Sequence, residues 1–315
     1  MSTVFKIIGA SHDPNVYYCK HLAERIMNLN SDNSSNVTID FAIYLEIEYL
    51  PQLQKIKTIC GGGAYGHKAL HIVVRDGIYI GDIKAFIELA KYEYGIEDAD
   101  IANDIAFNRY SREETLNILS ANGRKTVFLD FAADAKKKKG TKDQSDEDIP
   151  KYGKVVIELF TDVCPIACEN FQKLCTGEAG VSENGTQLNF IGSPIHRIVQ
   201  GGWIQGGDIV DGTGSNSLAA IGTNNKVRDE SFSVDFGCPS GGIVGMSTSS
   251  PHSNGSQFFI TLGPADWMNG KFVGVGRVIQ GFDVLKKIEA APSVNQKPSQ
   301  MIYVETCGNY VIIPN

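Results

Sequence analysis

The chain has 315 residues, of which 42% are hydrophobic and 21% charged, and a formal net charge of -7 at pH 7. This length exceeds the usual size of one hydrophobic core, so we expect two domains. The negative charge argues against general nucleic-acid binding, which depends on clustered lysine and arginine. No apolar run approaches the ~20 residues that span a bilayer, and the first residues lack the basic start of a signal peptide. We therefore expect a soluble, cytoplasmic protein with no nucleic-acid or membrane partner.

The seven cysteines are scattered without the spacing of metal ligands. Cys164 and Cys168 lie four residues apart, but no second pair completes a zinc site. Reduced thiols are the expectation for an intracellular protein. Exposure decides whether Cys168 or Cys175 is a redox-sensitive thiol. We predict no metal and no cofactor.

The first 123 residues alternate between strand and helix patterns. An Asp76-Gly77 pair predicts a hairpin turn, the stretch Asn28 to Asn36 reads as a loop, and the capping box Ser111 to Glu114 predicts the start of a helix ending near Gly123, where we place the domain boundary. The apolar patterns predict strands at 4–9, 37–43, 70–74 and 78–80, and helices from residue 14, at 50–56 and at 83–94.

This order of elements resembles a thioredoxin or glutaredoxin-like domain, most closely at Val74 to Gly81. The dithiol that the resemblance would place after the first strand is absent, because Ala10 to Asn15 contains no cysteine and Cys19 falls inside the predicted helix. Thiol-disulfide exchange needs an accessible thiolate and a resolving thiol. The resemblance therefore implies a thioredoxin-like α/β domain at residues 1–123 without redox activity.

The rest of the chain is dominated by predicted strands. Strands are expected at 126–131, 154–160, 301–304 and 310–313, and helices at 165–174 and 282–290. A charged segment at about 135–152 is expected to be mobile, since it is longer than a hairpin turn. Its lysines 136–139 are followed closely by acidic residues, which is typical of a solvated loop.

Two stretches in this half carry the chemistry. Ile195 to Asp208 places Arg197 eight residues before Gln205, with apolar residues and glycines between them. Asn254 to Ile260 adds a second amide and two aromatic rings. This combination suits a shallow, partly apolar groove for a peptide better than a metal or phosphate site.

With the motifs at 169–171, 175–178 and 267–271, these stretches resemble the cyclophilin-type peptidyl-prolyl cis-trans isomerases, in order from about Val127 to the end of the chain. The run 200–210 and the long N-terminal extension are most similar to a divergent subgroup of that family. The resemblance implies a closed, eight-stranded antiparallel β-barrel with a helix at each end, spanning residues 124–315.

The resemblance also implies roles for individual residues. Rotation of an Xaa-Pro bond meets a barrier of ~18 to 20 kcal/mol, which an apolar grip on the ring and a donor aimed at the prolyl nitrogen lower. Arg197 matches the polarising arginine and Gln205 its neighbour, while Gln257 matches the substrate-anchoring glutamine and Phe259 the floor of the proline pocket. The remaining groove positions are Trp203, Met246, Ser247, Thr248, Trp267, Met268 and Phe272.

Several groove positions depart from the family pattern. Gly202 stands where a large ring is usual, Trp203 replaces a methionine, Thr248 an asparagine and Phe272 a histidine. Each lost wall costs ~1 to 3 kcal/mol in complementarity. An ion pair between Arg197 and a nearby carboxylate, such as that of Asp208, would also prevent this arginine from polarising the prolyl amide.

Two hypotheses remain. The first is a peptidyl-prolyl isomerase of reduced efficiency, and the second is a catalytically inactive scaffold or proline-peptide binding module. If Trp203 or Phe272 fills the space beside Phe259, the second gains. The expected partners are proline-containing segments, together with an assembly such as a ciliary axoneme or microtubule, contacted through the N-terminal domain.

Overall fold

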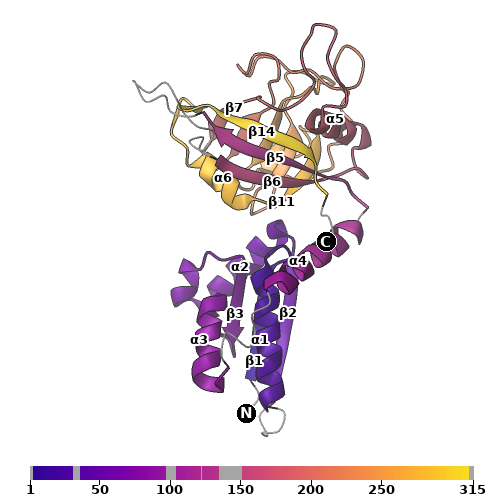
Figure 1. Cartoon of the computed structure of the whole chain (residues 1–315). Coiled ribbons are helices and arrows are strands. Elements are labelled where there is room, and N and C mark those ends of the chain that lie inside the picture. Colours follow the sequence, from indigo (N-terminus) through magenta and orange to yellow (C-terminus); the bar gives the residue numbers. More distant parts are fainter. Residues whose placement is uncertain (1–2, 31–35, 97–103, 122, 135–150, 312–315) are drawn as a thin grey trace, which may run out of the picture. The chain divides into compact units, whose positions relative to one another are not determined.

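The computed structural model describes residues 3–30, 36–96, 104–121, 123–134 and 151–311. The chain forms two compact units that divide between Gly123 and Arg124 (Figure 1). Among the described helices, none combines the length and the apolar character that crossing a bilayer requires.

The N-terminal unit is a four-stranded sheet with helices on both faces. Its strands lie in the order β2-β1-β3-β4, with β1 and β2 parallel and the other pairs antiparallel. The strands are β1 (Thr3–Ala10), β2 (Val37–Tyr44), β3 (His71–Arg75) and β4 (Ile78–Gly81), and the helices are α1 (Pro14–Asn30), α2 (Glu46–Cys60), η1 (Gly62–Gly66), α3 (Ile83–Tyr94) and α4 (Asp104–Ala121).

The alternation of side chains along β1 separates two apolar clusters. Phe5 and Ile7 are buried in a cluster with Leu22 of α1 and Phe86 of α3. Ile8 lies in the other cluster, which contains Leu53 of α2. Each face of the sheet is therefore covered by its own helices.

Most predicted elements of this unit are present, with three corrections. The Asp76-Gly77 turn has positive φ at both residues, as a two-residue hairpin requires, and α3 has the predicted bounds, capped by the Asp82 carboxylate.

Helix α4 begins seven residues before the predicted cap at Ser111, whose hydroxyl donates back to the Asn108 carbonyl. The stacking of Phe107 on Tyr18 of α1 holds these upstream turns in place. Likewise α1 continues through residues 28–30, and α2 starts at residue 46 rather than 50.

A buried polar network lies just beyond β1. Asp13 accepts a hydrogen bond from His71 Nδ1 at 2.6 Å, and His71 Nε2 accepts one from the Ile83 backbone N–H at 2.8 Å, which requires the neutral ring. His67 Nε2 donates to the His71 carbonyl at 2.7 Å, and its Nδ1 accepts from the Tyr79 hydroxyl at 3.0 Å. Burial lowers the pKa of His67. Both imidazoles are therefore uncharged in the folded unit.

The C-terminal unit is an eight-stranded antiparallel sheet, in the order β14-β5-β6-β11-β9-β10-β8-β7. A bridge between Pro194, which precedes β7, and Tyr303 of β14 joins the two edges, so the sheet curls into a nearly closed barrel. This confirms the predicted barrel. The strands are β5 (Thr126–Ala133), β6 (Lys151–Leu159), β7 (Ile195–Val199), β8 (Trp203–Gly206), β9 (Ile243–Met246), β10 (Phe258–Thr261), β11 (Gly274–Gln280) and β14 (Ile302–Asn309).

Helices α5 (Pro165–Thr176) and α6 (Phe282–Glu289) lie at different ends of these strands (Figure 1). Phe171 of α5 packs against Phe190 and Phe258, with ring centroids 5.1 and 5.7 Å away, and this contact seats the helix on the barrel. The short elements η4 (Asp266–Met268), β12 (Ser293–Val294) and β13 (Lys297–Pro298) complete the unit.

Two strand predictions in this unit were wrong in their bounds. Residues 151 and 152 begin β6 instead of ending the charged segment, whose residues 135–150 lie outside the described residues. The strand predicted at 301–304 continues to Asn309 as β14, because a bulge between Val304 and Thr306 lets the chain follow β5 further. The strand predicted at 310–313 is not borne out at Tyr310 and Val311, which follow β14 outside any strand, and residues 312 and 313 lie outside the described residues.

A buried carboxylate is bonded to two arginines in the barrel. Glu158 of β6 is fully buried and accepts from Arg277 Nε at 2.7 Å and from Arg124 Nη1 at 3.3 Å. The thiols of Cys168 and Cys175 are buried in α5, and burial raises the pKa of both. Neither thiol has the exposure that a redox-sensitive cysteine needs, which counts against that role at both positions.

Candidate peptide groove

Strand pairing gathers the predicted groove residues into one row. Arg197 of β7 pairs with Gln205 of β8, which pairs with Phe259 of β10, which pairs with Gly245 of β9. Directly paired residues project from the same side of a sheet. The cation, the amide and the ring that lie far apart in the sequence thus become neighbours.

The two glutamines form a fixed amide chain. Gln205 Nε2 donates to Gln257 Oε1 at 3.0 Å and to the Ser247 hydroxyl at 3.1 Å. Gln257 Nε2 in turn donates to the carbonyls of Gly214 and Asn216, both at 2.9 Å. Gln257 is buried, so its orientation is set before any ligand arrives.

The Arg197 guanidinium is exposed but engaged. Its Nε donates to Gln296 Oε1 at 2.7 Å, and its Cζ lies 5.2 Å from the centroid of the Trp203 ring. The expected alternative, a pair with Asp208, is not what the structure shows: the buried Asp208 carboxylate accepts backbone N–H groups of its own loop, from residues 210, 211, 214 and 216. Burial lowers the pKa of the adjacent His196, so this imidazole is uncharged at neutral pH.

Gln296 is the residue that sequence reasoning missed. It lies in the turn between β12 and β13 with φ of 67°, a left-handed conformation in which glycine is usual. Its backbone carbonyl also accepts from the Ile198 N–H at 2.7 Å, which fixes the turn against β7. The available signal was the Asn295-Gln296 pair, a two-residue turn with a long polar side chain where a glycine fits best.

The ring at the predicted floor of the proline pocket is covered. Phe259 is only 3% exposed. Phe272 packs edge-on against it at 5.2 Å, and Phe236 packs from another direction at 5.7 Å. A Cβ added at Gly245 would lie 2.3 Å from Phe259 Cζ, so the ring rests directly on the backbone of β9. Phe272 therefore fills space beside Phe259, the outcome that favours the second hypothesis.

Comparison with known proteins gives the family. The family model described as "Cyclophilin type peptidyl-prolyl cis-trans isomerase/CLD" matches residues 145–309. The chain belongs to the cyclophilin family. Similar proteins include the human "Probable inactive peptidyl-prolyl cis-trans isomerase-like 6", 33% identical over 306 residues that cover 96% of this chain and 91% of that protein. The Bos taurus protein of the same name is 31% identical over 305 residues, covering 96% and 92%. The mouse protein is 42% identical over 161 residues, covering 51% and 50%.

In this cyclophilin the predicted groove positions Trp203 and Trp267 lie together with two cations. The rings of Trp203 and Trp267 have centroids 5.8 Å apart, and Trp267 is 54% exposed. Lys271 Nζ lies 5.8 Å from the Trp267 ring. Arg197, the half-buried Trp203, the exposed Trp267 and Lys271 therefore form one series of cation and ring contacts.

The other predicted groove residues of the cyclophilin domain support the site from below or beside it. Met246 and Met268 are buried, so they hold up the groove without lining its surface. The Thr248 hydroxyl is used within its own turn, where it bonds the Ser250 carbonyl and the Ser253 hydroxyl. At Gly202 an added Cβ would lie 3.0 Å from Val199 Cγ1, so a neighbour already occupies part of the space that the missing ring would leave.

Proposed function

We propose that the cyclophilin domain binds proline-containing protein segments without efficient isomerisation. The main support for the proposal is that the Arg197 guanidinium is already hydrogen-bonded to Gln296 and lies over the Trp203 ring. The human and bovine relatives bear the words "Probable inactive" in their names, which supports the same proposal.

The physical reason is the geometry that catalysis requires. A donor must meet the prolyl nitrogen as the amide loses planarity, and it acts best when it is already aimed there. In this groove the guanidinium must first leave an indole face and a hydrogen bond. The ring of Phe259 also presents little surface to a proline, being 3% exposed. The engagement of Arg197 raises the cost of the transition state more than that of simple binding, whereas the covered Phe259 weakens the grip on a proline ring in both states.

A slow isomerase is the second candidate. The row Arg197, Gln205 and Phe259 is present in register, and the arginine is exposed at the groove surface. A guanidinium carries five N–H donors, so one bond to Gln296 leaves others for a substrate.

Exchange NMR on a series of Xaa-Pro peptides separates the candidates. We expect the tryptophan indole signals to shift on peptide addition, while the cis-trans exchange rate is the same for the wild type and for Arg197→Ala. A wild-type rate that clearly exceeds that of Arg197→Ala would establish the slow isomerase. Indole signals that stay unchanged for every peptide would refute binding in the groove.

For the N-terminal unit we propose a thioredoxin-like docking domain in the cytoplasm that attaches the cyclophilin domain to an assembly such as a ciliary axoneme or microtubule. The strand order supports the resemblance, and the buried Cys19, whose pKa is raised by burial, supports the absence of redox chemistry. Ile78 and Tyr92 are 66% and 92% exposed. The full chain should co-sediment with microtubules and lose this property on Ile78→Ser with Tyr92→Ser; failure of the wild type to sediment would reject the microtubule proposal.

A further inference from the structure

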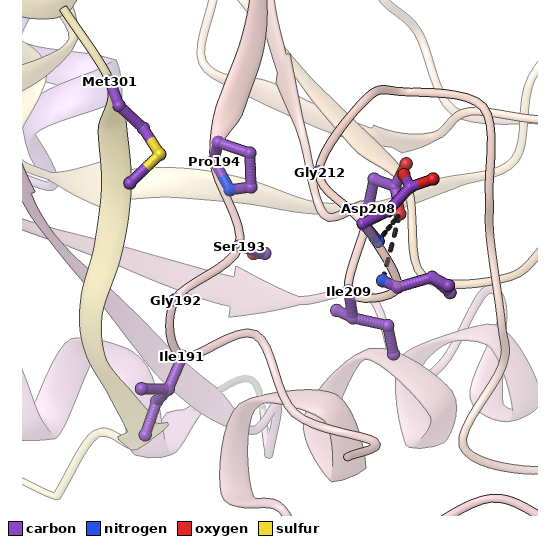
Figure 2. A pocket seen from close by; sticks show the side chains of 10 residues that line it. Ile191, Gly192, Ser193, Pro194, Asp208, Ile209, Gly212 and Met301 are labelled. Atoms are coloured by element: carbon purple, nitrogen blue, oxygen red, sulfur yellow. Dashed lines mark hydrogen bonds between the residues drawn. The ribbon is translucent and has the colours of Figure 1, made fainter. Parts of the chain in front are cut away.

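A hollow lies on the cyclophilin domain, and none of the predicted groove residues lines it. It is bounded by the segment Ile191 to Pro194 ahead of β7, the loop Asp208 to Gly212 after β8, and Met301 ahead of β14, with a volume of about 370 Å³. Figure 2 shows Ile191 to Pro194 running between Met301 and the loop that carries Asp208 and Ile209. This volume falls within the ~300 to 1,000 Å³ range of small ligand sites.

Solvent-exposed apolar side chains border the hollow. Ile191 is 56% exposed, Met301 46% and Val210 43%. Single exposed apolar residues are ordinary, but several around one depression mark a contact surface. The part of a ligand that enters this hollow should therefore be apolar.

Hydrogen bonds within the loop after β8 fix one wall of the hollow. The Asp208 carboxylate accepts four backbone N–H groups from residues 210 to 216. Gly212, with φ of 71°, lies so close to the Pro194 ring that an added Cβ would be 2.8 Å from Pro194 Cγ. A preformed site loses little conformational freedom on binding.

One wall of the hollow carries an exposed acid, Asp211, and a second exposed acid, Asp134, is bonded through its backbone to Met301 of the other wall. Asp211, exposed on the loop, accepts from the Thr213 N–H and from Asn216 Nδ2, and these bonds keep its carboxylate ionised. On the other side, Asp134 donates its backbone N–H to the Met301 carbonyl.

The exposed carboxylates of Asp211, which lines the hollow, and of Asp134, next to Met301, favour a cationic partner beside the apolar contact.

We propose that this hollow binds a segment of a partner protein that inserts one large apolar side chain and carries a lysine or arginine on either side of it. The apolar side chain would contact Ile191, Val210 and Met301, and the flanking cations would meet Asp211 and Asp134. The site is separate from the peptide groove, so it stands whether or not the groove binds proline.

The test is methyl NMR of the full chain with three capped pentapeptides, in which glycines flank Lys-Leu-Lys, Glu-Leu-Glu or Lys-Ser-Lys. We expect only the Lys-Leu-Lys peptide to shift the methyl signals of Ile191, Val210 and Met301. Asp211→Asn should weaken its binding about twofold to fivefold, as for an exposed ion pair. Met301→Ser should weaken it further, whereas the matched control Val181→Ser, at a valine 53% exposed elsewhere on the domain, should leave it unchanged.

Three results would overturn the proposal: no methyl shift with any peptide at millimolar concentration, equal shifts with Glu-Leu-Glu, or binding that emerges only after lysines 136–139 are replaced. The last result would mean that the chain's own lysines occupy the site. Amide spectra of each variant establish that the loop is intact, and Val210→Ser repeats the test if Met301→Ser alters it.

Discussion

Releasing Arg197 should convert the groove into a measurably better isomerase. The change is Trp203→Met combined with Gln296→Gly, which removes the ring under the guanidinium and the amide that accepts from its Nε. Gly at position 296 also suits the left-handed backbone there. The hairpin should therefore stay folded.

The magnitude follows from the two contacts. An exposed cation–π contact contributes ~0.5 to 1 kcal/mol, and an exposed hydrogen bond of this kind about 1 kcal/mol. Removing about 1.5 to 2 kcal/mol of restraint makes the guanidinium roughly tenfold more available, because ~1.4 kcal/mol corresponds to a factor of ten. We expect kcat/KM to rise by about that factor, and less if Phe272 still excludes the proline ring.

Exchange NMR on one Xaa-Pro peptide measures this rise. Asn295→Gly is the matched control, since Asn295 also has a positive φ in the same turn but leaves the Gln296 side chain in place. The same double substitution in an Arg197→Ala background should show no gain. A gain that persists without the arginine, or no gain with it, would refute the reasoning.

Three further outcomes are expected. Glu158→Gln leaves two arginines facing a neutral amide in a buried site, so urea unfolding should show a loss of about 3 kcal/mol; a loss below 1 kcal/mol would mean that water replaces the carboxylate. Gly245→Ala should displace the Phe259 ring and lower stability by about 1 to 3 kcal/mol, visible as changed ring signals, whereas unchanged signals would contradict the packing described. Burial lowers the pKa of His67 in the folded unit below its ordinary value of 6.5, which applies to the unfolded chain. As the pH falls below 6.5, the unfolded chain therefore takes up a proton before the folded unit does. The free energy of unfolding is at its full value above pH 6.5 and falls by up to ~1.4 kcal/mol per pH unit below it. His67→Gln should flatten that fall, as urea titrations followed by amide signals of the N-terminal unit would reveal.

The sequence predicted most elements because local patterns and tertiary packing agree over them. Helix α3, with its amphipathic pattern and Asp82 cap, has the predicted bounds, and the barrel follows from strand patterns and family motifs. The start of α4 could not be predicted from Ser111, since the turns before it depend on packing between Phe107 and α1. A local capping motif yields to a tertiary contact in such a case.

The sequence predicted which groove residues are neighbours. It did not predict which other side chains contact them. Motif positions placed Arg197, Gln205 and Phe259 together, and strand register accounts for it. Gln296, 99 positions after the arginine, reaches it through a hairpin that carries no family motif. How far Phe259 is covered depends on Gly245 and Phe236, which only the folded barrel brings to it.

The chain has two tryptophans, and both occupy predicted groove positions, with ring centroids 5.8 Å apart. Tryptophan fluorescence, excited at a wavelength that tyrosine does not absorb, therefore originates from this one place and not from the N-terminal unit, whose aromatic residues are tyrosines and phenylalanines. Occupancy of the groove can be followed on the unlabelled protein, by emission quenching in a cuvette, for any peptide added to it.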